Sequence, residues 1–439
     1  MTLSEDKITK IRAVRIFWKK FTLWLERHQK AVLFVLLGLQ AAGLAASFLF
    51  FGVLLYPDSP SYIEPAQSFL NSGVMADADG LPTLFRTPGY ILLLAAVYGA
   101  GGNNTVVVLL QMAMCMGIGL IIYSVVKDIS GKAYLGILGL LLWVMHLENY
   151  DYALGILTEL PFAFFCALAL FFFCRFWQGG RYRDIMACFL SLNYALLIRP
   201  QLMYYSIIAA IGLAAASLMR KVSWKVTVPY VCMFLLCFGG WCWRNYSHFG
   251  DPQYTFIRHK DYLEYYAPYV HGMLEKTSLE ESREYMHGLA RAEAPDYDEL
   301  PPVEKLYVGA GVGKGYVKQH VGAFLAVNLK GLFLEMMAPG ASFIDSFGLP
   351  RMVTLLCGGF FSFLLAVTYV VYAVGFLKNL SVLTKLDWLI FLSNVYLMAS
   401  TAVVGYSRFR MAFYAPCLIG AFLCWRDFGP EKKRKENVG

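Results

Sequence analysis

One carboxylate directly follows the first long apolar run of the sequence. Asp58 lies within the string YPDSPSY at residues 56–62. A carboxylate at the edge of a bilayer can act as a base and accept the proton of an acceptor hydroxyl, and ionisable groups near hydrocarbon tend to be functional. The alternative is that Asp58 caps a helix that begins near Ser59. Both interpretations of Asp58 remain open from the sequence.

Five arginines adjoin the ends of apolar runs, on the face of the membrane where the positive-inside rule predicts few basic residues. A guanidinium group is planar and can form two hydrogen bonds to one phosphate, so these residues are candidates for phosphate binding. The alternative for each single arginine is that its side chain extends to the outer lipid headgroups. A set on one face favours phosphate binding. The residues are Arg86, Arg199, Arg244, Arg408 and Arg410.

Three further carboxylates, Glu148, Asp151 and Glu159, lie at the outer ends of apolar runs, with His146 nearby. They could hold a divalent cation, but they lack the close ligand spacing of motifs such as HExxH. We therefore interpret them as a structural hydrogen-bond network and predict neither a metal site nor a cofactor. The sequence also lacks the nucleophile elbow of a Ser/His/Asp hydrolase.

The elements that must position these residues are membrane spans. Of the 439 residues, 58% are hydrophobic and 15% are charged, whereas an ordinary soluble domain has roughly 25% charged residues. The apolar runs are long enough to cross the hydrocarbon core, which takes roughly 20 helical residues. The net charge of +8 comes from basic residues at the ends of these runs, so it indicates membrane orientation rather than nucleic-acid binding. The ten cysteines lie in or beside apolar runs and predict no disulfides.

We predict an all-α polytopic fold with about ten transmembrane helices, within a range of roughly 9–13, in the inner (plasma) membrane. Basic residues in the short connections and in both terminal segments place both termini in the cytoplasm. The predicted spans are residues 31–56, 105–126, 133–148, 159–175, 184–198, 202–219, 226–243, 352–376, 388–404 and 410–425.

The predicted outer face then has two substantial segments, residues 57–104 and 244–351. Each contains a short apolar stretch, at 89–100 and at 321–337, which we expect to be a helix at the outer interface. The glycines within 309–315 predict a flexible connector rather than a phosphate-binding loop, because their spacing does not match GxGxxG after a strand.

Several strings of the sequence resemble bacterial GT-C glycosyltransferases, which are relatives of the dolichyl-phosphate-mannose protein mannosyltransferases and of the lipid A aminoarabinose transferase. The resemblance covers most of residues 31–250 and returns near 405–425. It is carried by Asp58 with Tyr62, RTPGY at 86–90, Thr158 with Glu159, Arg199 with Pro200, WRNY at 243–246 and RFR at 408–410.

The resemblance implies inverting transfer of a sugar from a polyprenyl-phosphate donor to a hydroxyl of a lipid, glycan or protein acceptor at the outer face. The family's proposed base in the first outer loop corresponds to Asp58. The protein mannosyltransferases have an Asp-Glu pair there, whereas Ser59 follows Asp58 here, so protein-acceptor activity is in doubt. We expect Arg244 to hold the donor phosphate with help from Arg86, Arg199, Arg408 or Arg410, and further substrate contacts from Tyr62, Glu64, Tyr90, Glu159 and Asn245.

The resemblance also implies a division of the chain into a conserved seven-helix module and a variable C-terminal set of helices. We expect a cytoplasmic amphipathic arm at 1–30, where apolar and basic residues alternate at helical spacing, and a basic cytoplasmic tail at 426–439. Between them lie the catalytic module at 31–243 with its outer loop 57–104, the extracytoplasmic segment 244–351 and the C-terminal helices at 352–425.

Two other classes of protein are compatible with the spans. A lipid-linked sugar flippase or secondary transporter would also use arginines, but it would have functional charges near the bilayer midplane, while the candidate charges here cluster at the outer edge. A non-catalytic membrane scaffold accounts for the spans and not for the arginines. A glycosyltransferase is therefore the leading hypothesis.

Overall fold

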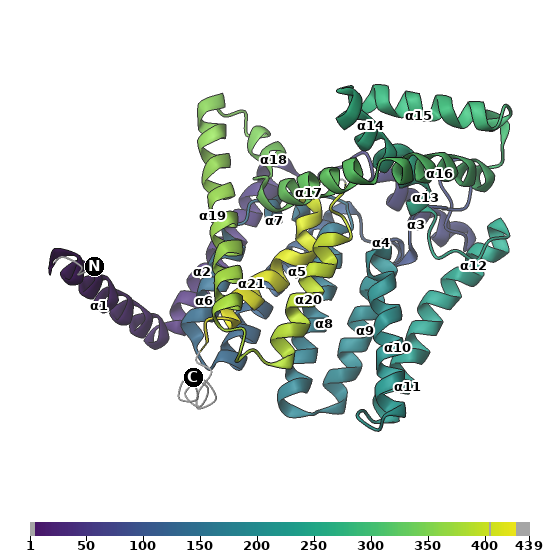
Figure 1. Ribbon diagram of the computed structural model, residues 1–439. Coiled ribbons are helices and arrows are strands. Elements are labelled where there is room, and N and C mark those ends of the chain that lie inside the picture. The colour runs from purple at the N-terminus through teal and green to yellow at the C-terminus, as the bar shows by residue number, and fades with distance from the viewer. Residues whose placement is uncertain (1–4, 404, 427–439) are drawn as a thin grey trace.

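The computed structural model describes residues 5–403 and 405–426, and the regular structure of this part of the chain is helical apart from two isolated β-bridges. Each of the ten predicted spans overlaps a helix or a pair of consecutive helices, and the spans predicted at 31–56 and 388–404 run past the ends of their helices (Figure 1). These helices are α2 (Gln29–Phe51), α5 (Asn104–Ser130), α6 (Ala133–Val144), α8 (Glu159–Gly179), α9 (Tyr182–Ile198), α10 (Met203–Leu218), α11 (Trp224–Phe234) with α12 (Gly240–Phe249), α19 (Arg351–Lys378), α20 (Lys385–Ala399) and α21 (Met411–Leu423).

Six helical stretches in the described residues are long and apolar enough to cross a membrane. They are α2, α5, α8, α10 with the turn before it, α11 joined to α12 through a π-helical turn, and α19. A seventh is counted if α16 (Pro302–Gln319) and α17 (Val321–Met337), which meet at a bend of 97°, form one broken span. The remaining predicted spans lie on helices of 12 to 17 residues. The chain is therefore an all-α, multi-pass membrane protein.

The helices α13 to α17 gather at one end of the helix bundle, where α15, α16 and α17 run across the ends of the upright helices (Figure 1). The long helix α1 extends away from the body near the opposite end. The bounds of the helices outside the predicted spans are α1 (Glu5–Arg27), α3 (Pro60–Ser72), α4 (Pro88–Gly99), α7 (Glu148–Leu154), α13 (Ile257–Asp261), α14 (Ala267–Glu275), α15 (Leu279–Glu293) and α18 (Ala341–Asp345), in addition to α16 and α17.

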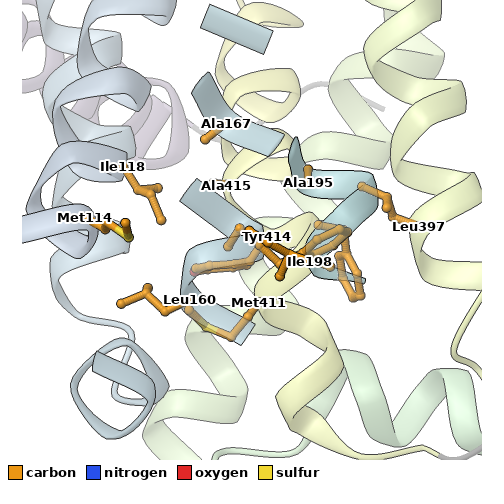
Figure 2. Close-up of a cluster of buried hydrophobic side chains, with 14 of the residues drawn as sticks. Met114, Ile118, Leu160, Ala167, Ala195, Ile198, Leu397, Met411, Tyr414 and Ala415 are labelled. Carbon is orange, nitrogen blue, oxygen red and sulfur yellow. The ribbon is translucent and has the colours of Figure 1, made fainter. Parts of the chain in front are cut away.

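The main core lies where α5, α8, α9, α20 and α21 meet (Figure 2). Helix α21 is at its centre, because all but one of its thirteen residues are buried. Lipid chains are as apolar as leucine, so van der Waals contact rather than removal from water drives such packing within a membrane. The tight fit around α21 fixes the position of the turn that precedes it, and this turn carries Arg408.

The glycines at 309–315 are not a flexible connector, contrary to the prediction from the sequence. They lie inside helix α16. A Cβ atom at Gly313 would lie 2.5 Å from the backbone oxygen of Tyr262, so the missing side chain lets α16 pack directly against the Tyr262 backbone. The glycine pattern therefore marks a close contact between two helical segments rather than a hinge.

Both short apolar stretches form helices, as expected. Helix α4 packs against the end of α9, where the Thr87 hydroxyl donates to the Ile198 carbonyl at 2.9 Å and the Tyr194 hydroxyl donates to the Gly89 carbonyl at 3.0 Å. The predicted amphipathic arm is also helical over Glu5–Arg27, with Phe17, Trp18 and Trp24 exposed. The ten cysteines form no disulfides.

Candidate functional site

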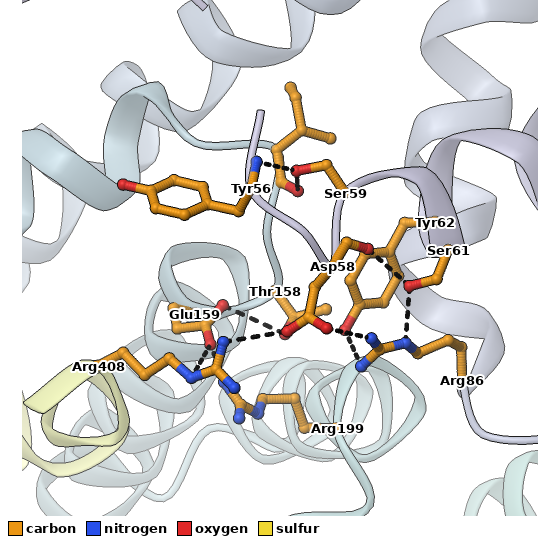
Figure 3. A network of polar contacts seen from close by, with 11 residues as sticks. Tyr56, Asp58, Ser59, Ser61, Tyr62, Arg86, Thr158, Glu159, Arg199 and Arg408 are labelled. Carbon is orange, nitrogen blue, oxygen red and sulfur yellow. Dashed lines mark hydrogen bonds and ion pairs between the residues drawn. The ribbon is translucent and has the colours of Figure 1, made fainter. Parts of the chain in front are cut away.

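Asp58 lies between two arginines that come from distant parts of the sequence (Figure 3). Arg86 Nη2 is 2.8 Å from Asp58 Oδ1, and Arg408 Nη1 is 3.0 Å from Asp58 Oδ2. About a third of the Asp58 side chain is exposed. Its carboxylate thus bonds to two guanidinium groups rather than to the first backbone N–H groups of α3, which argues against the capping interpretation.

The turn that carries Asp58 is held from both sides. Ser59 is buried, and its hydroxyl accepts a hydrogen bond from Tyr56 N and donates one to the Ile156 carbonyl, both at 2.9 Å. Pro60 then begins α3, because its fixed φ suits the first helical position and its missing N–H is not needed there. The sequence YPDSPSY therefore fixes the position of the carboxylate relative to both neighbouring helices.

Arg86 uses all three of its nitrogens within this site. Its Nε donates to the Ser61 hydroxyl at 2.9 Å and its Nη1 donates to the Tyr62 hydroxyl at 3.0 Å, while Nη2 binds Asp58. The guanidinium also lies 4.6 Å from the centre of the Tyr62 ring. Arg86 is therefore a rigid partner that orients Asp58.

Arg199 and Arg408 have unused hydrogen-bond donors. Arg199 Nη1 pairs with Glu159 Oε1 at 3.1 Å, and Arg408 Nε is 3.9 Å from the same oxygen. Arg408 Nε is buried and has no hydrogen-bond partner among the described residues. Both guanidiniums contact the ring of Phe409, at 5.2 and 5.1 Å. The two arginines thus share one carboxylate and one ring, and Arg408 also binds Asp58. Arg408 Nη2 and the Nε and Nη2 of Arg199 have no hydrogen bond to a described residue, so each guanidinium can still bind an anion.

Arg86 and Arg408 determine the charge state of Asp58. Burial is the largest single influence and acts to raise its pKa, but the charges of Arg86 and Arg408 and their hydrogen bonds together outweigh it, so the pKa lies below its usual value. Asp58 is therefore ionised at neutral pH in this arrangement.

A cavity of about 460 Å³ opens beside this cluster and joins it to the segment 244–351. Asp58, Arg86, Arg199 and Arg408 line one part of it. The other part is lined by residues that the sequence analysis did not select, among them Arg258, Lys260 and Asp261 of α13 and the tyrosines Tyr204, Tyr265 and Tyr266. The only signal for them in the sequence is the charged string RHKD at 258–261, which is typical of any solvated surface.

Asp261 is the second carboxylate on the cavity wall. Unlike Asp58, it has no hydrogen bond or ion pair with any described residue. Burial raises its pKa to about 7, although the charges of Lys260, Arg258 and Arg86 oppose this increase. Asp261 therefore gains or loses its proton near neutral pH.

Two of the five predicted arginines lie outside the cavity. Arg244 donates to the backbone carbonyls of Thr83 at 2.7 Å and Met75 at 3.3 Å, and it lies over the Trp241 ring at 4.7 Å. Arg410 is fully buried and binds Glu148 Oε2 at 2.5 Å. Arg244 thus ties the loop after α3 to α12, and Arg410 lies within the core.

Of the other residues predicted to contact substrate, two lie at the cavity and three do not. Tyr62 lines the cavity, and Glu159 lies directly behind it, paired with Arg199. Tyr90 is buried with its hydroxyl on Gln111 at 2.7 Å, Glu64 accepts from Ala78 N at 3.2 Å, and Asn245 donates to the Gln253 carbonyl at 2.6 Å. These three residues hold the protein together and do not reach the cavity.

Glu148, Asp151 and the nearby His146 have partners within the protein. Glu148 binds Arg410, His146 Nε2 accepts from Arg410 Nε at 3.1 Å, and Asp151 accepts from the Tyr56 hydroxyl. In the described part of the chain, no group of three or more His, Cys, Asp or Glu residues is arranged to hold a metal ion. Glu148, His146 and Asp151 are therefore engaged in contacts within the protein, while Glu159 pairs with Arg199 beside the cavity.

Residues 86–243 match the dolichyl-phosphate-mannose-protein mannosyltransferase family. No curated protein matches the chain. The archaeal oligosaccharyltransferase AglB from Archaeoglobus fulgidus, solved with an inhibitory peptide and a dolichol-phosphate, is similar at 12% identity and a TM-score of 0.46, over 94% of this chain and 52% of its own.

ArnT from Cupriavidus metallidurans, bound to undecaprenyl phosphate, is similar at 14% identity and a TM-score of 0.37, over 92% of this chain and 77% of its own. This chain spans about half the length of the archaeal protein. The matched residues 86–243 begin at Arg86 and include Arg199 of the cavity and Glu159, its ion-pair partner. They confirm the resemblance to the mannosyltransferase family that the sequence motifs indicated.

Proposed function

We propose that this protein is a membrane glycosyltransferase, which transfers a sugar from a polyprenyl-phosphate donor to a hydroxyl of an acceptor at the extracytoplasmic face, with inversion at the anomeric carbon. The observation that carries the proposal is the position of Asp58, a carboxylate on the wall of a cavity whose same wall presents Arg199 and Arg408. The match of residues 86–243 to a family named for a lipid-phosphate sugar donor supports this class of donor.

In the proposed reaction, the acceptor oxygen forms a bond to the anomeric carbon while the bond from that carbon to the phosphate oxygen breaks. The electron pair of the broken bond remains on the polyprenyl phosphate, and the hydroxyl proton moves to Asp58. Attack opposite the leaving group inverts the configuration. Negative charge grows on the phosphate during this step, so fixed cations beside it lower the barrier.

We assign the donor phosphate to Arg199 and Arg408, because each has guanidinium donors that the protein does not use. Arg86 has the different role of holding Asp58, since all its nitrogens are already bonded. Arg244 and Arg410 are left out of the phosphate site because other protein groups occupy them outside the cavity.

A phosphate between Arg199 and Arg408 would also change Asp58. The phosphate would compete with Asp58 for Arg408 and add a negative charge nearby, and both effects raise the pKa of a carboxylate. Donor binding would thereby convert Asp58 from a weak base, stabilised by two cations, into a stronger one. This coupling predicts that the base becomes active only when the donor is present.

The direct test is incubation of the purified protein with a panel of polyprenyl-phosphate sugars and candidate acceptors, followed by mass spectrometry. We expect release of the polyprenyl phosphate together with a product that contains a new glycosidic bond. Movement of an intact lipid-linked sugar across vesicles, with no new bond, would instead identify a flippase or transporter and would contradict the proposal.

A further inference from the structure

A second cavity of about 370 Å³ lies next to the first and shares part of its wall. Met203, Tyr204, Thr255 and Arg258 line both cavities. The second cavity is completed by α13 and α16, which contact each other at one end of the bundle (Figure 1). The two cavities are therefore neighbours along one stretch of wall.

The wall of the second cavity is positively charged. It includes Arg258 of α13 and Lys314 of α16, and it contains neither Asp nor Glu. Neither cation has an ion pair with a carboxylate among the described residues. Arg258 donates to the Tyr204 hydroxyl and Lys314 lies 5.2 Å from the centre of the Tyr262 ring. Aromatic rings hold both cations in place without neutralising their charge.

A histidine lies in the same wall. His259 Nδ1 is buried and has no hydrogen-bond partner among the residues that the structure describes. The carboxylate of Asp251, whose charge acts on His259, accepts hydrogen bonds from the Tyr307 hydroxyl and from Gln253 N. A buried ring nitrogen without a partner is costly unless a ligand or water binds it. The cavity thus offers two cations, Arg258 and Lys314, to an anionic group, with the His259 ring beside them.

We propose that this second cavity binds an anionic group, a phosphate or a carboxylate, carried by the acceptor. This inference rests on the proposed function, which assigns the donor phosphate to Arg199 and Arg408 next to Asp58. A phosphate at the breaking bond cannot also lie one cavity away, and a polyprenyl chain is apolar and would not enter a charged pocket. The acceptor is the remaining reactant. It would present a hydroxyl to Asp58 while its anionic group lies between Arg258 and Lys314.

The test uses inorganic phosphate as the ligand and undecaprenyl phosphate to fill the donor site, with protein purified in an uncharged detergent. Calorimetry would measure the phosphate affinity of the wild type, Lys314→Met, Lys314→Arg and Lys318→Met. Lys318 is exposed one turn further along α16, so Lys318→Met is the matched control. We expect Lys314→Met to bind phosphate roughly tenfold more weakly or worse, because a hydrogen bond to a charged group is lost.

Lys314→Arg and Lys318→Met should retain the wild-type phosphate affinity, and the affinity for undecaprenyl phosphate should be the same in all four proteins. Unchanged phosphate affinity in Lys314→Met would overturn the inference. So would parallel loss of both affinities, because the second cavity would then be part of the donor site. Failure of undecaprenyl phosphate to bind any of the four proteins would count against the proposed donor instead, and the Lys314 comparison would still report on the second cavity.

Discussion

At the scale of single residues, the site depends on which nitrogens and oxygens are already bonded. Asp58 has two arginine partners, and they hold its pKa below its usual range although burial acts in the opposite direction. A strongly stabilised carboxylate is a weak base, and catalysis is most efficient when the pKa of the base lies near the working pH. If the donor phosphate drew Arg408 away from Asp58, the pKa of Asp58 would rise toward the working pH and Asp58 would become a better base.

The arginines should separate into two groups when they are changed one at a time. Arg408→Ala should weaken binding of undecaprenyl phosphate by roughly tenfold or more, since a charge-assisted hydrogen bond is lost. Arg244→Ala should leave this affinity unchanged and lower thermal stability, because the carbonyls of Thr83 and Met75 lose their donor. Lipid affinity and melting temperature would be measured on both variants. The reverse pattern would return Arg244 to the phosphate site.

Asp261 should make stability depend on pH. Its pKa is raised to about 7 in the folded protein, above its ordinary value of 3.8. The folded state therefore keeps a proton that the unfolded state has lost between these pH values, and the wild type loses stability as pH rises through this window. Asp261→Asn should remove this loss, so its melting temperature relative to wild type should increase from about pH 4 to about pH 7 and then stay constant.

The control for this measurement is Asp296→Asn, which changes an exposed carboxylate of the same segment. It should keep the pH profile of the wild type. An Asp261→Asn profile parallel to that of the wild type would contradict a proton on Asp261 near neutral pH.

The sequence identified the residues next to helix ends and could not identify their partners. Arg86, Arg199 and Arg408 were expected near Asp58, and the structure brings them there. Arg244 and Arg410 have the same chemistry and similar positions, but backbone carbonyls and a buried glutamate bind them. Partner choice depends on packing between segments that are far apart in the chain, and no local pattern encodes it.

At the scale of elements, the site is assembled from the ends of helices. Asp58 precedes α3, Arg86 precedes α4, Glu159 begins α8, Arg199 follows α9, and Arg408 lies in the turn before α21. Prolines at the first positions of α3 and α4 and directly after Arg199 stop or start these helices. Side chains at such ends lie beyond the helix body and can meet in a cavity.

The close contact between Gly313 of α16 and the backbone of Tyr262 can be tested by substitution. Gly313→Ala should destabilise the protein by about 1–3 kcal/mol, the usual cost of forcing an extra group into a packed contact, because its Cβ atom would meet the Tyr262 carbonyl. Gly311→Ala is the matched control on the same helix, since nothing lies near its Cβ position. It should stabilise the helix by about 0.5–1 kcal/mol.

Denaturation of both variants in detergent would measure these effects. Equal stabilisation by the two changes would mean that α16 does not pack against Tyr262 as described. The two glycines also explain why the sequence predicted a flexible connector at 309–315 where the structure has a helix. Glycines without flanking turn residues favour either flexibility or close packing, and only the neighbouring backbone decides between them.

At the scale of the whole molecule, the upright helices form the bundle and the helices α13 to α17 lie at one end of it (Figure 1). The all-α membrane fold could be predicted from the sequence, because apolar runs of about 20 residues carry a strong signal. Shorter helices such as α6 and α21 have weaker signals. Within the segment 244–351 the sequence predicted only the helix at 321–337, whereas the structure adds α13 to α16. The contribution of this segment to the cavity depends on how it folds back over the helix ends.

The orientation of the chain remains a prediction from loop charge. Tags at residues 1 and 439 should both report the cytoplasm, and an epitope near Glu293 should be accessible from outside. Protease protection in oriented vesicles would measure this, with a tag in the basic connection near Lys221 as the inside control. Protection of the Glu293 site from external protease would move the cavity to the other face of the membrane.

The central claim is that Asp58 is the general base, and Asp58→Asn tests it most directly. Asparagine keeps the shape of the side chain and cannot accept the proton, so turnover should fall by roughly 10²- to 10⁴-fold. Loss of the negative charge also frees Arg408, so affinity for undecaprenyl phosphate should stay the same or increase. We would measure turnover, lipid affinity and melting temperature of this variant at matched protein concentration. Turnover near the wild-type rate, or a loss of turnover matched by a loss of lipid affinity and stability, would contradict the claim.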